Sequence, residues 1–536
     1  MKTNIMLLDC TLRDGAYVND GKFGVPCIKG IIKQGVKANI DIIECGWLKN
    51  DAYKKGSTYF HVPSDVIPFL GVKDAGKLYV AMIDWDRYDV SCLPEFDGKS
   101  LDAIRVVFPH GKCTEALKVA EEIKKKGYKV LLQAANTLAY NEEDLIALAK
   151  AVNELLPSSL SVVDTFGAMY SDDLDRIIGI LDGELDSRIA LGFHSHNNMQ
   201  LSFALCIHFV SALYGKRDVV VDASLCGMGR GAGNATTELV ANFLNQRYHK
   251  NYDMNQIMDA IDMYMAGFIE KYKWGYSTPY FIAGMYQCHV NNIAYLQRNH
   301  RTNSRDMRNI IDSLSVEERR KYDYDLLEAK YLENQGRNVP DEKEMEYLKQ
   351  ALGDRTVLLI GPGKTTVTEQ ERIHAYIARI NPIVIFVNAL NPLYEGEFLF
   401  LINSTRYEYA KNAYKEQFAS VKRIILSNIK TVSNENEIVV NFNSVIKRGW
   451  EHFDNAIITC LRLMNRLSVK NVGIAGFDGF TQNYNESYAD ESLPTLSPEN
   501  IADELNAEIQ DIFDDFCNTV RSEMKMEFVT TCMFEK

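Results

Sequence analysis

Eight short apolar runs that alternate with longer helical patterns constrain the fold of this chain more than any other feature. Each run is long enough for one buried strand, and each stretch between two runs is long enough for a crossover helix. Eight units of this kind predict a closed (β/α)8 barrel. The runs cover residues 5–8, 40–44, 78–83, 103–108, 129–133, 160–163, 189–193 and 219–223.

A second series of strand and helix patterns begins at residue 356, after a highly charged stretch. The chain has 536 residues, which is too long for one ordinary domain of roughly 150 residues. We therefore expect a barrel domain over 1–245, a helical extension and linker over 246–350, and a second α/β domain over 351–536. The strands expected in the second domain cover residues 356–360, 383–388, 398–402, 423–426 and 472–475.

Composition indicates a soluble globular protein, with 46% apolar and 24% charged residues. No apolar run approaches the ~18 residues of a membrane span, and the apolar stretch at the N-terminus is too short for a signal peptide. The 11 cysteines are scattered without CxxC pairs, which favours a reduced, cytoplasmic location. A net charge of −13 argues against nonspecific nucleic-acid binding. Separately, we expect the chain to form a homodimer.

Polar residues gather at the carboxyl ends of the predicted barrel strands, the face that carries the chemistry in such barrels. Arg13 and Asp14 follow the first strand, at a turn that Gly15 permits. Two opposite charges at the end of a buried strand are costly unless each has a partner. A divalent metal for Asp14 and an anionic substrate for Arg13 would supply these partners.

The second part of this pattern is His194-Ser195-His196, directly after the strand predicted at 189–193. Residues i and i+2 of a strand point to the same side, so the two imidazoles project together. One carboxylate and two imidazoles from separate strand ends form a facial metal site with open positions. Asn234, in a glycine-rich loop, is either a further ligand or a residue that shapes the loop, and both interpretations stay open.

Five sequence segments support a family resemblance. They are TLRDG at 11–15, IIE at 42–44, DTFGAM at 164–169, HSHN at 194–197 and GRGAGNA at 229–235. In this order they resemble the DRE-TIM metallolyase superfamily, which includes hydroxymethylglutaryl-CoA lyase, isopropylmalate synthase and 4-hydroxy-2-oxovalerate aldolase. The last two segments are most similar to the hydroxy-oxovalerate aldolases.

The resemblance implies a site for Mn²⁺ or Mg²⁺, and sometimes Zn²⁺, whose three ligands are Asp14, His194 and His196. It implies that Arg13 holds the enolate of a 2-oxo acid and that Glu44 orients Arg13. Thr165, with its neighbour Asp164, would lie beside the substrate carboxylate.

Position 17 departs from the aldolase pattern. In the hydroxy-oxovalerate aldolases a histidine two positions after the RDG motif serves as the acid or base, and here that position is Tyr17. A tyrosine can donate or accept a proton, but its unperturbed pKa of about 10 suits a base poorly near neutrality. The chain also lacks the Gly-Cys-Pro loop of the CoA lyases, which lowers the expectation of an acyl-CoA substrate.

The C-terminal half carries short motifs, such as IGPG at 360–363 and VGIAGFDGF at 472–480. They resemble the Rossmann-like core of bacterial sialyltransferases, which implies a nucleotide- or nucleotide-sugar-binding domain. The GPGKT sequence at 361–365 is either a phosphate cradle or a plain strand-to-helix turn, because it lacks the spacing of a P-loop. The candidate nucleotide-binding residues are Gly361, Gly363, Asn388, Ser427 and Ser444.

Three functions follow from these patterns. The first is a metal-dependent aldolase that joins or separates the enolate of a 2-oxo acid, pyruvate, and an aldehyde, sugar-derived if the second domain binds nucleotide-sugars. The second is a Claisen-type synthase that condenses an acyl-CoA with a 2-oxo acid on the same metal. The third is a glycan- or nucleotide-binding protein in which the barrel is only a scaffold, and the complete ligand set argues against it.

Overall fold

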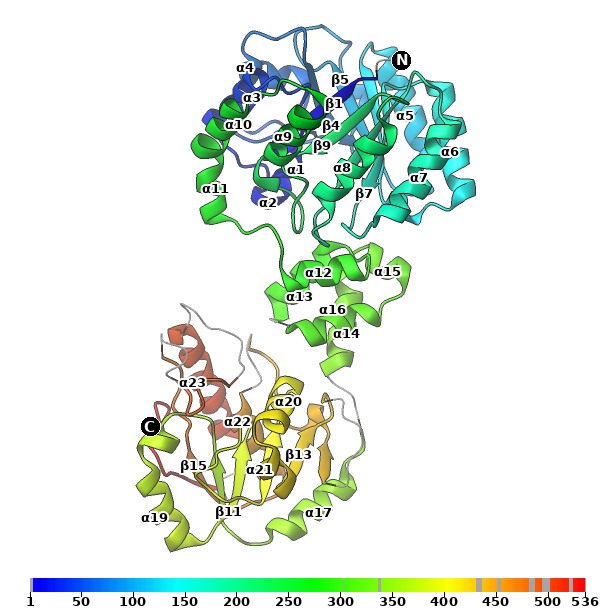
Figure 1. Cartoon of the computed structure of the whole chain (residues 1–536). Helices are drawn as coiled ribbons and strands as arrows, with labels where there is room; N and C mark the ends of the chain where they lie inside the picture. The colour runs from blue at the N-terminus through cyan, green and yellow to red at the C-terminus, as the bar shows by residue number, and fades with distance from the viewer. Residues whose placement is uncertain are drawn as a thin grey trace. The chain divides into compact units, whose positions relative to one another are not determined.

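The chain forms two compact units, seen in the computed structural model of Figure 1. The first comprises Met1–Ala294 with Leu314–Asp323, and the second comprises Tyr295–Ser313 with Tyr324–Lys536. The structure describes residues 3–300, 302–335, 339–429, 436–450, 455–481, 487–493, 502–519 and 524–535.

The first unit contains the predicted parallel barrel. Its strands are paired in chain order, and β1 also pairs with β2 and with β9, so the sheet closes. The short strand β3 (Tyr59–Phe60) adds to β2 outside the eight. The barrel strands are β1 (Ile5–Asp9), β2 (Ile42–Leu48), β4 (Leu78–Asp84), β5 (Ala103–Phe108), β6 (Lys129–Ala134), β7 (Ser159–Asp164), β8 (Ala190–Ser195) and β9 (Val219–Ala223).

The barrel strands are buried on both faces, as parallel strands between a filled interior and a ring of helices must be. All residues of β2, β7, β8 and β9 are buried. Helices surround the strands in Figure 1. The crossover helices are α3 (Val25–Lys37), α4 (Ile67–Leu70), α5 (Cys113–Lys125), α6 (Glu142–Leu155), α7 (Ser171–Glu184) and α8 (Ser202–Leu213), and α9 (Thr237–Tyr248) follows the last strand.

The chain after α9 continues within the first unit. It forms α10 (Met254–Ala260), a π-helical turn (Ile261–Met265), α11 (Ala266–Lys271) and α12 (Thr278–Met285). This segment packs on loops at the carboxyl ends of the strands. The Trp274 indole N–H donates to the carbonyl of Cys226 at 2.9 Å, and a Cβ on Gly284 would lie 3.2 Å from Asn198 Cβ. The segment therefore helps to form the rim of the barrel.

The second unit is built on a seven-stranded parallel sheet in the order β14-β13-β12-β11-β10-β15-β16. All five strands expected from the sequence are present. The two additional strands, β14 and β16, lie at the edges and carry polar residues, which weakens their sequence signal. The strands are β10 (Val357–Ile360), β11 (Ile383–Val387), β12 (Phe398–Leu401), β13 (Lys422–Leu426), β14 (Glu437–Val440), β15 (Asn471–Ala475) and β16 (Lys525–Phe528).

Helices cover both faces of this sheet, because alternate strand residues feed two separate apolar cores. Leu359 lies in one core and Leu358 in the other. The first core includes residues of α17 (Glu342–Leu352), α22 (Ala456–Arg466) and α23 (Ala502–Thr519). The second includes residues of α19 (Gln370–Ile380), α20 (Ser404–Ala413) and α21 (Lys415–Ser420).

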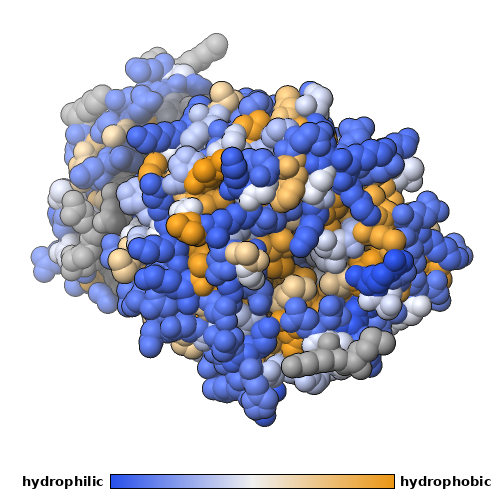
Figure 2. All heavy atoms as spheres, turned by 90° about the horizontal axis from the view of Figure 1, so that it is seen from above, coloured by the Kyte–Doolittle hydropathy of each residue, from blue (hydrophilic) through white to orange (hydrophobic). Residues whose placement is uncertain are grey.

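The second unit also includes helices that precede its sheet, α14 (Ser304–Asp312) and α16 (Tyr324–Gln335). The remaining helices of this region are α13 (Val290–His300) and α15 (Val316–Arg320). Among the described residues, no helix is both long and apolar enough to cross a bilayer. The face shown in Figure 2 is mostly hydrophilic, and its apolar side chains form small patches.

Helix α17 is joined to the second sheet although it precedes the first strand of that sheet. Leu348 is fully buried in the core, and Asp341 forms a bidentate ion pair with Arg466 of α22 at 2.6 and 2.7 Å. The Asp341 carboxylate also accepts the backbone N–H of Asn441 at 2.9 Å. Residues from Asp341 onward are thus part of the folded second unit.

We predict that Leu348→Ala destabilises the second unit by about 2–5 kcal/mol, the usual cost of a buried leucine cavity. Lys349→Ala, at an exposed position of the same helix, should change stability by no more than about 0.5 kcal/mol. Calorimetric unfolding of the full chain measures both. Equal unfolding temperatures for the two variants would show that α17 does not belong to this core.

Candidate metal centre

Three predicted ligands meet at the carboxyl end of the barrel. Asp14 ends the short helix α1 (Thr11–Asp14) directly after β1, His194 lies in β8, and His196 follows one residue after the strand. One ligand atom from each lies within 4.8 Å of the others, and all three side chains are buried. This is the facial carboxylate and bis-imidazole set expected from the sequence.

Nδ1 of each imidazole faces a protein oxygen, with hydrogen-bond geometry in His196 and only at ion-pair distance in His194. His196 Nδ1 lies 3.2 Å from the carbonyl oxygen of Asp164, and His194 Nδ1 lies 3.1 Å from Asp222 Oδ2. Metal-bound histidines commonly use the second ring nitrogen in this way. The arrangement leaves Nε2 of each ring available for a metal.

Two buried atoms in this cluster test whether a metal fits. Among the described residues, neither His196 Nε2 nor Asn234 Oδ1 has a hydrogen-bond partner. His196 Nε2 lies 3.5 Å from Asp14 Oδ2, so an acceptor nitrogen faces a carboxylate. A cation between them removes this conflict, and the donor set fits a divalent ion.

Protonation of the ligands also favours a cation. Although burial opposes ionisation, the neighbouring Arg13 guanidinium holds the pKa of Asp14 well below its ordinary value. Burial lowers the pKa of His194, so this imidazole stays neutral. A carboxylate and neutral imidazoles are the states that bind metals.

Arg13 lies beside the metal ligands and is held by carboxylates. Its Nε donates to Glu44 Oε2 at 2.9 Å and its Nη1 donates to Asp14 Oδ1. The Trp47 indole N–H donates to the Arg13 carbonyl at 3.0 Å and fixes the backbone. Burial opposes the charge, but Glu44 and Asp14 raise the pKa of Arg13 well above its ordinary value, so it stays a cation.

The charge network continues through Arg105, which the sequence analysis did not select. Arg105 is fully buried in β5, donates to Glu44 Oε2 at 2.8 Å, and pairs with Asp222 of β9. A chain of ionic contacts thus runs from Asp14 through Arg13, Glu44 and Arg105 to Asp222, and the neutral His194 ring lies at its end. An arginine inside an otherwise apolar strand run was the sequence signal, because such a charge requires a buried partner.

This network holds one more negative than positive charge. The carboxylates of Asp14, Glu44 and Asp222 face the guanidiniums of Arg13 and Arg105, and the pKa of Asp222 is lowered by Arg105 in spite of burial. A buried excess charge is unfavourable unless a counter-ion compensates it. A divalent cation would leave one positive charge, which matches the carboxylate of a 2-oxo acid.

The loop after β9 closes over these ligands. Asn234 Nδ2 donates to Asp14 Oδ2 at 2.8 Å, and exchange of its amide atoms would aim Oδ1 at the same position. Gly229 must lack a side chain, since a Cβ there would lie 2.4 Å from Asp14 Oδ2. Asn234 therefore shapes the loop, and its amide lies within hydrogen-bond distance of the candidate ligand Asp14.

Asp164 and Thr165 are adjacent to the centre, and both have protein partners. The Asp164 carboxylate accepts the backbone N–H groups of Ala168 and Met169 at 2.9 and 3.3 Å, and burial raises its pKa to about 6. Thr165 Oγ1 accepts the N–H of Asn136 at 2.6 Å. Both side chains hold the loop after β7 beside His196.

Tyr17 lies at the mouth of the site, in the short helix α2 (Ala16–Asn19). Its ring packs edge-on against Trp47 with centroids 5.9 Å apart, and the Arg230 guanidinium lies 4.2 Å from its ring centroid. Although part of Tyr17 is exposed, partial desolvation raises its pKa above its ordinary value. Tyr17 thus keeps its proton, and the sequence analysis did not identify Arg230 as its neighbour.

The residues predicted to bind a nucleotide lie after several strands of the second sheet. A Cβ on Gly361 or on Gly363 would lie 2.6 Å from the Gly476 carbonyl, so both glycines pack tightly against the turn after β15. Asn388 is buried after the neighbouring strand β11. Gly361, Gly363 and Asn388 therefore lie at adjacent strand ends.

Ser427 and Ser444 lie at the β13 and β14 side of the sheet, away from β10. Ser427 Oγ accepts the N–H of Phe442 at 3.0 Å, and Ser444 Oγ donates to the Asn441 carbonyl at 2.6 Å. Their hydroxyls contact the backbone at the end of β14.

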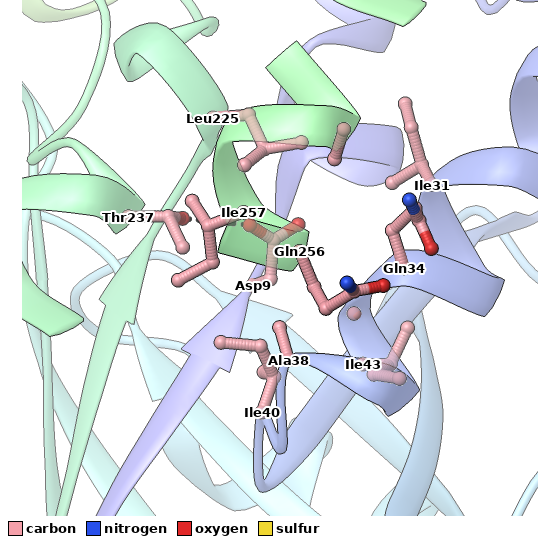
Figure 3. A pocket seen from close by; sticks show the side chains of 12 residues that line it. Asp9, Ile31, Gln34, Ala38, Ile40, Ile43, Leu225, Thr237, Gln256 and Ile257 are labelled. Carbon is pink, nitrogen blue, oxygen red and sulfur yellow. Dashed lines mark hydrogen bonds between the residues drawn. The ribbon is translucent and has the colours of Figure 1, made fainter. Parts of the chain in front are cut away.

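A small pocket in the first unit lies between α3, α10 and the end of β1 (Figure 3). Apolar side chains line most of it, and its polar groups are those of Asp9, Gln34, Gln256 and Thr237. The Asp9 carboxylate is already occupied, since it accepts the Thr237 hydroxyl at 2.6 Å and the Thr11 N–H at 3.1 Å. The pocket contains none of the three predicted ligands.

Comparison with known proteins agrees with this geometry. The family model HMGL-like matches residues 110–263. Oxaloacetate decarboxylase of Mycobacterium tuberculosis is 26% identical over 271 residues, which cover 49% of this chain and 76% of that protein. The 4-hydroxy-2-oxovalerate aldolase of Pseudoalteromonas translucida is 24% identical over 271 residues, 48% of this chain and 75% of that protein.

Among solved structures, the N-terminal domain of a candidate aldolase from Bacteroides vulgatus aligns with a TM-score of 0.48 at 24% identity. The alignment covers 55% of this chain and 97% of that domain. The motif order, the closed barrel, the ligand set and the HMGL-like match over residues 110–263 together show that the barrel of this chain resembles the DRE-TIM metallolyase superfamily.

Proposed function

We propose that the barrel is a divalent-metal-dependent carbon–carbon lyase that acts on a 2-oxo acid, in the manner of a class II aldolase. The buried Asp14, His194 and His196 cluster with its uncompensated charge and orphaned acceptor atoms carries this proposal. Relatives named 4-hydroxy-2-oxovalerate aldolase and oxaloacetate decarboxylase support it. Both names describe chemistry in which the bond between C3 and C4 of a 2-oxo acid forms or breaks.

Arg13 stabilises the charge that this reaction develops. When bound, the metal supplies Lewis-acid polarisation of the 2-oxo group. Glu44 fixes the Arg13 guanidinium, so that its remaining N–H groups are already oriented toward the oxygen that becomes an enolate. The burial of Arg13 strengthens this contact because little solvent screens it.

Tyr17 is the residue we assign to proton donation. Its hydroxyl stays protonated near neutrality, since its pKa is raised. It can therefore donate to the carbonyl oxygen of the aldehyde as the carbon–carbon bond forms, and recover the proton in cleavage.

We propose Mn²⁺ as the working metal, with Mg²⁺ or Zn²⁺ as the alternatives. One carboxylate, two imidazoles and the Asn234 amide combine oxygen and nitrogen donors, which suits Mn²⁺ better than the all-oxygen sites typical of Mg²⁺.

We predict that His194→Ala and Asp14→Asn lower metal affinity by more than about 100-fold, because losing a direct ligand exceeds the ~10–100-fold cost of losing an outer partner. Metal content after dialysis against buffered Mn²⁺, together with activity, measures this. His208→Ala, which removes a half-buried histidine of α8, is the matched control. Full activity of either ligand variant without metal would refute the metal mechanism.

We predict that Arg13→Lys lowers turnover by about 10²–10³-fold, the usual effect of losing one oriented donor to a developing oxyanion. Lysine keeps the charge but cannot contact both Glu44 and the substrate through a planar fork. Initial rates with saturating metal test this, with circular dichroism to show that the fold survives. Turnover near that of the wild type would make Arg13 a structural residue.

Decarboxylation of a 2-oxo diacid is the second candidate, favoured by the relative named oxaloacetate decarboxylase. The same Arg13 contact would stabilise the enolate left when CO₂ departs. Incubation with oxaloacetate, or with pyruvate and an aldehyde, separates the two reactions. Release of thiol from acetyl-CoA would instead indicate the Claisen-type synthase.

We also propose that the second sheet binds a nucleotide or nucleotide-sugar beside β10 and β15. The chain runs from β10 outward to β14 and then returns to β15, so these neighbours form a switch point, the usual ligand position in open parallel sheets. Gly361, Gly363 and Asn388 lie beside it. The alternative is that this domain only stabilises or dimerises the chain.

We predict that titration of the full chain with CMP, UMP and their sugar conjugates gives heat of binding with at least one of them. Gly363→Val should abolish it, because a side chain would strike the turn at Asp478. A Lys349→Ala control should bind like the wild type. Absence of heat with every nucleotide would leave an assembly role for the domain.

A further inference from the structure

A row of cations and aromatic rings lies at the mouth of the metal centre. The Arg230 guanidinium stacks on Tyr17, Tyr17 packs against Trp47, and the Lys49 ammonium lies 4.3 Å from the Trp47 ring. The row begins at the metal ligands, since the backbone N–H of Arg230 donates to Asp14 Oδ2 at 3.3 Å. A molecule that reacts at the centre must therefore lie close to Arg230.

Arg230 differs from the other cations of the site in its partners. Arg13 and Arg105 are bound by carboxylates, and Lys49 pairs with Asp84 at 3.1 Å. Across the part of the chain that the structure describes, no carboxylate lies within ion-pair distance of Arg230, and its guanidinium has no side-chain hydrogen bond. Among the described residues, its guanidinium packs on the face of Tyr17.

The groups around Arg230 do not compensate its charge. Tyr17 is neutral because its pKa is raised, and burial together with the charge of Arg230 lowers the pKa of His289 to about 3. His289 precedes Val290, which lies against Gly231, so it belongs to the rim beside Arg230. At the mouth of the site, the Arg230 guanidinium is therefore held in one orientation, and its neighbours Tyr17 and His289 do not neutralise its charge.

We propose that Arg230, held by Tyr17, binds an anionic group of the second substrate, so that the carbonyl partner is an aldehyde that carries a phosphate or a carboxylate. This rests on the proposed lyase function. The carboxylate of the 2-oxo acid is already matched by the charge of the metal centre and Arg13, which leaves Arg230 for the partner. A guanidinium stacked on an aromatic face keeps its N–H fork in one plane, ready for bidentate contact with such a group.

Paired aldehydes that differ only in charge test this inference. With pyruvate and Mn²⁺, kcat/KM is measured for D-glyceraldehyde against D-glyceraldehyde 3-phosphate, and for butyraldehyde against succinic semialdehyde. We expect Arg230→Gln to lose about 10–100-fold more kcat/KM with the anionic member of the preferred pair than with the neutral one, since a hydrogen bond to a charged group is lost. The preferred pair distinguishes phosphate from carboxylate.

Two variants serve as controls. Arg188→Gln removes the same charge from an exposed residue that pairs with Asp186 before β8, and should behave as the wild type. Tyr17→Phe keeps the ring under Arg230 and should keep the preference for the anionic aldehyde while turnover falls. Equal losses for both members of each pair in Arg230→Gln would overturn the inference.

A binding measurement separates this inference from the lyase proposal. Exchange of the pyruvate C3 protons in D₂O tests enolate formation without any aldehyde, and its absence would contradict the lyase function alone. Calorimetry with sn-glycerol 3-phosphate and with 4-hydroxybutyrate, which have the anionic groups but no carbonyl, needs no turnover. Binding of one of them by the wild type and its loss in Arg230→Gln supports the subsite. No binding, or equal binding by both proteins, overturns it.

Discussion

The buried ionic chain from Arg13 through Glu44 and Arg105 to Asp222 is the interaction on which the site depends. It joins residues of β2, β5 and β9 with the segment after β1, so the same contacts that position Arg13 also connect distant strands of the barrel. Each charge is tolerated inside the barrel only because its neighbours offset the free-energy cost of burying it. Removing one partner of a buried pair typically costs about 3–5 kcal/mol. Barrel structure and site geometry are therefore coupled.

The same chain explains why a divalent cation belongs at this place. The carboxylates exceed the guanidiniums by one, and His196 Nε2, 3.5 Å from Asp14, has no hydrogen-bond partner among the described residues. A cation that binds the folded site but not the unfolded chain adds its binding free energy to stability. A centre with one net positive charge would match the carboxylate of a 2-oxo acid, and under the proposed function the negative charge of the enolate would develop against Arg13.

The strands and the meeting of Asp14, His194 and His196 could be predicted because both depend on local patterns. Buried parallel strands are short apolar runs, and alternation along a strand sets His194 and His196 on one side. Arg105 was within reach of the same reasoning, since a charge inside such a run needs a partner. The neighbours of Arg230 were not, because Tyr17 and Arg230 are more than two hundred residues apart and only the closed barrel brings them together.

Residues at the strand ends of this site are fixed by buried contacts, whereas residues in the loops can change. The ligands and Arg13 lie at or beside strand ends and are fixed by buried contacts, so the enolate half of the chemistry is rigid. Arg230 lies in the loop after β9, beside the segment that carries Trp274 and His289. In barrels of this kind loops change without loss of the core. The partner of the enolate is thus selected by the more variable part of the site, and the charge of Arg230 is the feature of that part most directly tied to substrate choice.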